Sequence, residues 1–324
     1  MKARLFALLS CAALVTTGFG VAAPNAIAAE TIGVTVTPTT PQVDDMLVVH
    51  ATVSGAATTP TLAVTRTDRN GQQPPFTLME TAAGEYSGND PLPAVWGRIS
   101  YVVSDTASGA EGRGSVYARR HTTSLTIHPA RRVVSAGRLA RVTAHLGTTF
   151  TNRRVTLYAR PFQRDRTQIR SGSVDATTGN LSASYTMSRR TRFVAKFGGD
   201  LKYRPAWARV VVLARAVVHE HLRGGYASDG AYRLFHVTEN PVLGVHMLPE
   251  LDGVCLLFRA ERHYNGAWHL VATGCVSTDS DGRAIGVLTG DHHLDSPYRV
   301  RARWRGTFAL LSKSGAWQRL KFRP

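Results

Sequence analysis

The chain has 324 residues, a formal net charge of +17 and 22 acidic residues against 39 basic ones. This length suits two or three domains, and no run after the first thirty residues is long or apolar enough for a membrane helix. The charge favours anionic partners. However, most of the basic residues are arginine and they are spread along the chain, as a GC-rich genome would produce without selection for binding.

The first residues predict a secretory signal peptide over residues 1–29. Lys2 and Arg4 form a basic start, residues 6–15 are apolar but too short to span a bilayer, and Ala26-Ile27-Ala28 fits the small-x-small cleavage rule. Cys11 lies inside the apolar stretch, which argues against a lipoprotein signal, although lipidation and a retained anchor stay open alternatives. We therefore expect a secreted, extracellular protein, either free or associated with the cell wall.

Residues 30–119 predict a first strand-rich unit of divergent sequence. Alternating apolar residues mark expected strands at 32–36, 46–53, 62–67, 99–103 and 115–118. Arg69-Asn70-Gly71 is a hairpin-type turn. Residues 85–87 are expected as a short edge strand, and the proline-containing segments 72–75 and 90–93 as loops or edges.

Residues 120–215 show the clearest strand pattern, after a short linker at 119–121. Apolar residues alternate at Ala140 to Leu146, at Val155 to Ala159 and, most strictly, at Phe193 to Phe197. A period of two places one face of each strand on a core, and the short spacing of Gly, Asn, Asp and Pro suits a β-sandwich. The short junctions near residues 120 and 215 should permit some swing.

Residues 216–324 repeat this pattern imperfectly. The matching pairs are Ser171 to Asp175 with Thr273 to Ser277, Thr178-Gly179 with Asp281-Gly282, Phe193 to Gly198 with Tyr298 to Trp304, and Ala206 to Val210 with Ala316 to Leu320. Repetition at about 100 residues indicates tandem sandwiches and not a solenoid of short repeats.

The central unit resembles the bacterial Ig-like repeats of secreted actinobacterial proteins. Those repeats carry a strand like Val155 to Arg160, a turn like Asp175 to Gly179, and a strand ending Phe197-Gly198-Gly199-Asp200 with Tyr203 following. The last unit looks like a diverged copy, and the first matches only in general pattern. The resemblance implies an Ig-like fold and a secreted, non-catalytic protein, and a fold does not fix a function.

Motifs for catalysis or metal binding are weak. Asp279 to Gly282 begins like a calcium loop but lacks the later oxygens, so a plain turn is favoured. His219 and His221 would share one face of a strand, and His292-His293 adds two more imidazoles, but a site needs three or four converging ligands. Surface histidines are the simpler interpretation, and we expect no catalytic residue, metal or cofactor.

Tryptophans could form a stacking platform for sugar rings. Trp207 and Trp304 lie in alternating strand patterns and are expected in the core. Trp268 follows the Asn265-Gly266 turn and is the best exposed candidate for ligand stacking, with core or edge packing as the alternative.

The two cysteines after the signal peptide, Cys255 and Cys275, predict one disulfide in a secreted protein. Residues 255–263 and 267–275 look like the two strands of a hairpin. A three-residue loop at 264–266 would place Cys255 directly opposite Cys275, whereas a two-residue loop would place it opposite Val276. We therefore expect the three-residue loop. Two free, separately buried thiols are the alternative.

The sequence as a whole predicts an all-β protein of three tandem Ig-like β-sandwich domains, at 30–119, 120–215 and 216–324, after the signal peptide at 1–29. We expect it to act in binding, adhesion or spacing at the cell surface without catalysis. The alternatives are a set of modules that bind an anionic cell-wall polymer or polysaccharide through charge, and a diverged secreted hydrolase. Another surface protein is also a candidate partner, whereas we expect no nucleic acid and no transmembrane helix in the mature chain.

Overall fold

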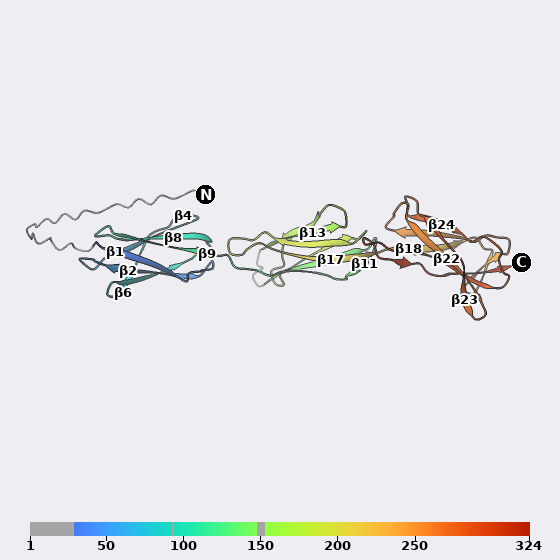
Figure 1. The fold of residues 1–324 in the computed structure, drawn as a ribbon, viewed down its shortest axis with the longest axis horizontal. Helices are drawn as coiled ribbons and strands as arrows, with labels where there is room; N and C mark the ends of the chain where they lie inside the picture. Colours follow the sequence, from blue (N-terminus) through green and yellow to red (C-terminus); the bar gives the residue numbers. More distant parts are fainter. Residues whose placement is uncertain (1–28, 93, 148–152) are drawn as a thin grey trace, which may run out of the picture. The chain divides into compact units, whose positions relative to one another are not determined.

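The computed structural model describes residues 29–92, 94–147 and 153–324, and every regular element in these ranges is a β-strand (Figure 1). The predicted all-β fold class is confirmed. Within the described ranges no helix is long and apolar enough to cross a membrane. Residues 1–28 of the predicted signal peptide, Cys11 included, lie outside the described residues. The chain divides into two compact units, Met1–Arg119 and Arg120–Pro324.

The first unit contains two antiparallel sheets. One has the order β1 (Thr31–Thr37), β2 (Met46–Ser54), β7 (Glu85–Pro91) and β6 (Met79–Ala82). The other has the order β4 (Gly71–Gln72), β3 (Leu62–Asp68), β8 (Gly97–Asp105) and β9 (Glu111–Ala118), with β5 (Phe76–Thr77) beside β3. Lettered along the chain, these orders read A-B-E-D and C′-C-F-G, which is the arrangement of an Ig-like sandwich.

The strand β7 corrects one expectation for this unit. It runs between β2 and β6, so residues 85–87 belong to an interior strand and not to an edge. Asp90 and Pro91, expected in a loop or at an edge, end that strand, where Pro91 pairs with Met46. A proline is tolerated at this last position because the ladder needs no donor from it beyond the strand end. Asp90 is thereby placed inside the sandwich.

The second unit, Arg120–Pro324, contains four sheets. In residues 120–215 one sheet has the order β10 (Leu125–Pro129), β12 (Leu139–Leu146) and β15 (Asn180–Thr186). The five-stranded sheet has the order β11 (Val133–Ser135), β17 (Ala206–Arg215), β16 (Thr191–Phe197), β13 (Arg154–Pro161) and β14 (Thr167–Ser173).

In residues 216–324 one sheet has the order β18 (Val217–Arg223), β21 (Val242–Leu248) and β24 (Arg283–Val287). The seven-stranded sheet has the order β19 (Ala227–Asp229), β20 (Tyr232–His236), β27 (Gln318–Arg323), β25 (Pro297–Trp304), β22 (Cys255–Tyr264) and β23 (Ala267–Ser277), with β26 (Lys313–Ser314) beside β25.

The two halves of this unit share one topology, which accounts for the sequence repeat. Each has a sheet of order A-B-E and a larger sheet whose strands C, F and G are antiparallel neighbours. In each, a short early strand also pairs in parallel with the last strand, β11 with β17 and β20 with β27. The matched segments therefore occupy equivalent strands. In particular, Trp207 in β17 and Trp317, just before β27, hold equivalent positions.

Contacts cross the junction between these halves near residue 215. The Leu311 amide donates to the Ala214 carbonyl at 2.8 Å, and the Ala216 amide donates to the Leu311 carbonyl at 3.2 Å. The Arg190 amide donates to the Ala309 carbonyl at 2.6 Å. The buried residues from Ile127 to Phe322 also form one continuous hydrophobic cluster. These contacts restrain the swing expected at this junction, whereas swing near residue 120 stays a prediction.

Candidate anion-binding face

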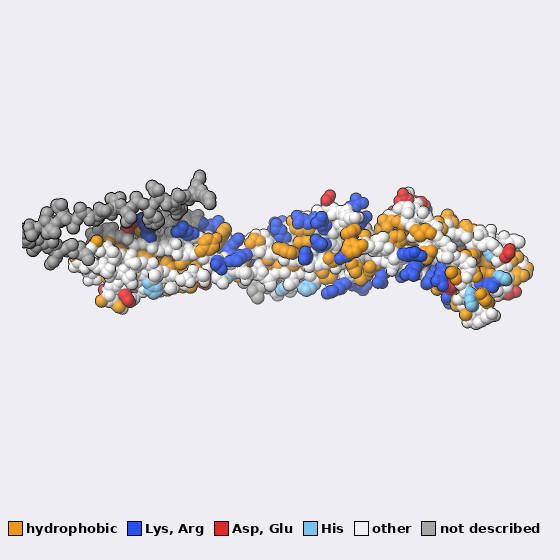
Figure 2. All heavy atoms as spheres, in the orientation of Figure 1, with side chains coloured by type: hydrophobic (Ala, Val, Ile, Leu, Met, Phe, Trp, Pro, Cys, Tyr) orange, Lys and Arg blue, Asp and Glu red, His pale blue; other side chains and the backbone are white. Residues whose placement is uncertain are grey.

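The outward face of the five-stranded sheet in residues 120–215 carries a group of exposed basic side chains. In β13, β16 and β17 the inward positions hold small and apolar residues, so the period of two places the intervening residues on the other face. Five exposed basic residues on that face are Arg154, Arg160, Arg192, Lys196 and Arg209, and Arg215 at the end of β17 is a sixth. Figure 2 shows Lys and Arg side chains gathered over this part of the chain, with few acidic side chains among them.

Strand pairing sets these charges beside one another. Arg160 lies directly opposite Arg192 across β13 and β16, and a like-charge pair in that position is destabilising, by up to about 1 kcal/mol. In the described part of the chain, no carboxylate lies within ion-pairing distance of any of the five basic side chains. Asp200, at the edge of the face, pairs instead with Arg153 at 2.8 Å. The face therefore keeps an uncompensated positive charge.

Trp207 adds an exposed aromatic ring to this face. It is 66% exposed and lies directly opposite Lys196. The guanidinium carbon of Arg209 is 5.7 Å from its ring centroid. The expectation that Trp207 lies in the core is wrong, because the inward positions of β17 are those of Val212 and Ala214. Trp304, by contrast, is buried as expected.

A hollow of about 410 Å³ lies on the same face beside Lys196. Its lining includes Arg154, Thr156, Tyr158 and the loop at 197–200. Thr156 is opposite Lys196 on one side and Trp207 is opposite it on the other. Thr156, Lys196 and Trp207 thus form one row across the three strands, in which Thr156 and Lys196 line the hollow and Trp207 presents an exposed indole ring beside them.

The seven-stranded sheet carries an equivalent face whose charge is partly neutralised. Its outward basic residues are Arg259, Arg299, Arg301, Arg303, Arg319, Lys321 and Arg323. The buried Glu261 accepts from Arg259 at 2.6 Å and from Arg299 at 2.5 Å. Burial acts to raise the pKa of Glu261, but the hydrogen bonds and charges of the two arginines outweigh it and hold that pKa below its ordinary value. Asp229 pairs with Lys321 at 3.0 Å.

Trp268, the predicted stacking residue, lies in a ladder of the protein's own side chains. The guanidinium carbon of Arg299 is 4.3 Å from the ring centroids of both Trp268 and Trp317, and that of Arg301 is 4.1 Å from Trp317. The His263 ring meets Trp268 edge-on at 5.1 Å. These cation–π contacts occupy ring faces that a ligand would need. Ligand stacking on Trp268 stays a prediction, and the ring of Trp207 is more open.

Cys255 and Cys275 form a disulfide in the structure, with their Cα atoms 5.5 Å apart. The predicted three-residue loop is wrong: Tyr264 pairs with Ala267 around a two-residue Asn265-Gly266 turn, in which both residues have positive φ, 49° and 75°. Asn-Gly suits that conformation at little steric cost. A register shift after Ala260 then places Cys255 opposite Ser277, so the bridge joins diagonal positions on one face of the hairpin.

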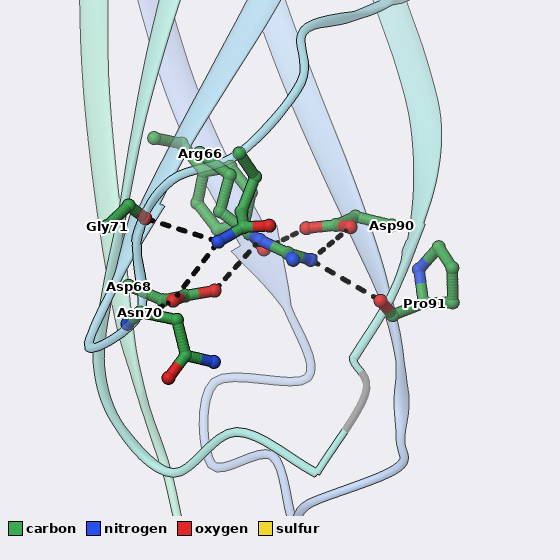
Figure 3. Close-up of polar contacts among 8 residues, drawn as sticks. Arg66, Asp68, Asn70, Gly71, Asp90 and Pro91 are labelled. Atoms are coloured by element: carbon green, nitrogen blue, oxygen red, sulfur yellow. Dashed lines mark hydrogen bonds and ion pairs between the residues drawn. The ribbon is translucent and has the colours of Figure 1, made fainter.

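The first unit holds a buried charge cluster that the sequence reasoning missed (Figure 3). Arg66 donates to Asp90 at 2.6 Å and lies 3.4 Å from Asp68, and Tyr101 donates its hydroxyl proton to Asp90 at 2.7 Å. Burial and this hydrogen bond raise the pKa of Tyr101. The signal was present, because Arg66 and Asp68 share the inward face of β3 with Leu62. The guanidinium pairs most closely with Asp90, whereas Arg66 Nε and Asp68 Oδ2 are buried without a hydrogen-bond partner among the described residues. The buried ion pairs indicate a structural cluster.

Glu220 is a second inward-facing charged residue. It lies on β18 between Val218 and Leu222, and its carboxylate accepts from the Ala302 amide. Burial raises its pKa to about 7. The second oxygen, Oε2, is buried and has no hydrogen-bond partner among the described residues.

The other predicted ligand residues are dispersed. His219 and His221 are exposed on β18, and His292 stacks on Phe322 with ring centroids 4.0 Å apart. Within the described ranges, no group of three or more His, Cys, Asp or Glu residues is arranged to hold a metal ion. Asp279 caps its own turn by accepting from the Arg283 amide at 2.8 Å.

The chain resembles several solved structures at low similarity. A tetra-tandem repeat from the extending region of a large adhesion protein is 16% identical, with 90% of this chain and 74% of that chain covered and a TM-score of 0.46. The Yersinia pseudotuberculosis adhesin InvE is 18% identical, with 57% of this chain and 58% of that chain covered and a TM-score of 0.30. Trypsin-activated α-2-macroglobulin from Escherichia coli is 9% identical, with 90% of this chain covered and a TM-score of 0.27. The match covers 23% of that protein, so this chain spans about a quarter of its length. No protein-family model and no curated protein matches the sequence. At these TM-scores the likenesses carry no conclusion about function.

Proposed function

We propose that the chain is a secreted, non-catalytic Ig-like protein that acts in binding and spacing at the cell surface. Its attachment site is the outward face of β13, β16 and β17, which binds an anionic surface polymer. The observation that supports this proposal is the group of five exposed basic residues, with no carboxylate in pairing distance within the described part of the chain. A polyanion along this face relieves the repulsion between Arg160 and Arg192, which the fold alone leaves uncompensated.

An arginine-rich composition alone does not account for this face. The other sheet of the same sandwich, made of β10, β12 and β15, carries a single arginine, Arg141, on its strands. A uniform excess of arginine would populate both sheets. The concentration on one sheet therefore favours a role for the charge in binding.

The test compares charge reversals on the two sheets. Lys196→Glu and Arg192→Glu change the proposed face, and Arg141→Glu makes the same change of charge on the opposite sheet as a matched control. Co-sedimentation with purified cell walls and with polygalacturonate is measured across a salt series. We expect retention on the polymer to fall steeply with salt. Lys196→Glu and Arg192→Glu should each bind about tenfold more weakly than the unmodified protein, whereas Arg141→Glu should bind nearly as well as it does. Equal weakening by all three variants, or no retention at low salt, would show the proposal to be wrong.

A further inference from the structure

We propose that Trp207 is a stacking platform for one sugar ring of an acidic polysaccharide, and that Lys196 and Arg209 bind the acidic groups of that polymer. This inference rests on the proposed function, because it names the class of polymer that the same face binds. Trp207 is the centre of the argument, since its ring is 66% exposed on a strand whose other face is well packed.

The openness of Trp207 contrasts with its equivalent in the last sandwich. Trp317 has guanidinium groups at 4.3 Å and 4.1 Å, whereas the nearest guanidinium carbon recorded over Trp207 is that of Arg209, at 5.7 Å. An indole ring left in water exposes a large apolar area. The C–H face of a pyranose is also apolar, so stacking the two removes both surfaces from water. The acidic and hydroxyl groups at the rim of the sugar then meet Lys196, directly opposite Trp207.

Hydroxyl groups continue the row away from Trp207. Thr156 lies opposite Lys196, and its hydroxyl is 3.0 Å from that of Ser171 on β14. Arg154 donates to the same Ser171 hydroxyl at 3.2 Å. Arg154, Thr156 and Lys196 line the hollow of about 410 Å³, a size within the range of about 300–1,000 Å³ that ligand clefts occupy. An acidic polysaccharide has a matching group for each of these residues. Its sugar ring can stack on Trp207, its hydroxyl groups can form hydrogen bonds, and its acidic groups can pair with the cations.

A single open platform argues against single-stranded nucleic acid. Proteins that bind such strands stack successive bases on several aromatic rings. Arginines cover two other aromatic rings beside this face: the Arg166 guanidinium carbon is 4.3 Å from the ring centroid of Tyr158, and that of Arg190 is 4.2 Å from the ring centroid of Phe308. A polyphosphate, which has no ring, would use only the cations.

The experiment measures the affinity of the mature chain for three probes: polygalacturonate, inorganic polyphosphate and poly(dT). The variants are Trp207→Ala, Trp207→Phe, and Tyr117→Ala as a control at another exposed aromatic, 57% exposed in the first unit. We expect Trp207→Ala to weaken polygalacturonate binding up to about tenfold and to leave polyphosphate binding within about twofold. Trp207→Phe should restore most of the lost affinity, because it keeps an aromatic face. Tyr117→Ala should bind as the unmodified protein does.

Each contrary outcome is informative. If Trp207→Ala weakens the binding of polygalacturonate and polyphosphate equally, or weakens neither, the stacking proposal is wrong. Binding that still depends on salt would support the proposed function in that case. Tighter binding of poly(dT) than of polygalacturonate would reassign the platform to single-stranded nucleic acid. Failure of all three probes to bind at low salt would remove both proposals. Because Trp207 is exposed, thermal unfolding of the variants should match that of the unmodified chain, and this confirms that each comparison is made on folded protein.

Discussion

Replacing Glu220 by Gln should stabilise the protein above neutral pH and leave it unchanged below pH 4.5. The Glu220 carboxyl lies between Val218 and Leu222 on the inward face of β18 and accepts from the Ala302 amide. A Cβ at Gly315 would collide with this carboxyl group, so a larger residue there would require the Glu220 side chain to move. Gln keeps the shape and the acceptor, and it resembles the protonated acid that burial favours.

The magnitude follows from the pKa, which burial raises from an ordinary 4.5 to about 7. Below 4.5 the carboxyl is protonated in both the folded and the unfolded chain, so it contributes no pH dependence. Between 4.5 and about 7 the unfolded chain loses this proton and the folded chain keeps it, so the free energy of unfolding falls as pH rises. The difference, 7 − 4.5 = 2.5 in pKa, corresponds to about 3 kcal/mol at 1.36 kcal/mol for each step. Partial solvent access of this carboxyl group reduces the expected effect to about half of that.

The assay is urea unfolding of the unmodified chain and of Glu220→Gln at pH 4.5, 6 and 8. The difference between the two proteins isolates Glu220, because every other ionisable group is present in both. Hydrogen exchange of the peptide that contains Ala302 locates the effect on β25. We expect the two free energies of unfolding to coincide at pH 4.5 and to separate by about 1–2 kcal/mol at pH 8, with the variant more stable. A difference that does not depend on pH, or a variant less stable at pH 8, would refute the reasoning.

The remaining predictions concern the disulfide, the buried charge cluster around Arg66 and the junction near residue 215. Thiol titration of the unfolded, unreduced chain should find no free thiol from Cys255 and Cys275, and a double Ser variant should lose about 3 kcal/mol of stability; two titratable thiols would rule the bridge out. Asp90→Ala should destabilise the first unit by about 3 kcal/mol, since it removes the nearest partner of Arg66 and the acceptor of the buried Tyr101 hydroxyl; a loss below 0.5 kcal/mol, typical of an exposed ion pair, would contradict this. Phe308→Ala removes a ring that packs 5.0 Å from that of Phe162 and lies under Arg190. Faster hydrogen exchange at residues 186–192 is expected, and unchanged exchange would show that this contact does not restrain the junction.

The alternation of side chains was enough to predict the strands and most of the core. The apolar residues at Ala140 to Leu146 and at Phe193 to Phe197 are buried as their period of two indicates. Trp207 was misplaced because alternation tells which residues share a face but not which face is covered. Arg209 lies on the same face of β17 as Trp207, whereas Val212 and Ala214 lie on the other face. An arginine on the face of Trp207 was the available sign that this tryptophan is exposed.

The hairpin register and the inward charges depended on features that alternation does not report. A bulge beside Val271 changes the pairing of Cys255, and it lies in a run of β23 where residues on both faces are exposed, so no apolar pattern marks it. A loop or an edge is expected for Asp90 because Pro91 follows it. In the structure Asp90 is buried near the end of β7, where it pairs with Arg66.

The positions of the carboxylates distinguish the two equivalent sheet faces of the second unit. On the seven-stranded sheet, Glu261 and Asp229 hold Arg259, Arg299 and Lys321 in ion pairs, so part of the charge there is used by the fold itself. On the five-stranded sheet the same topology brings basic residues together from strands that are far apart in sequence, and Asp200, at the edge, pairs with Arg153. Charge that the fold does not use is free to act on a ligand. The difference between two copies of one architecture therefore favours residues 120–215 for the proposed anion binding, and it could not be inferred from the net charge of either copy.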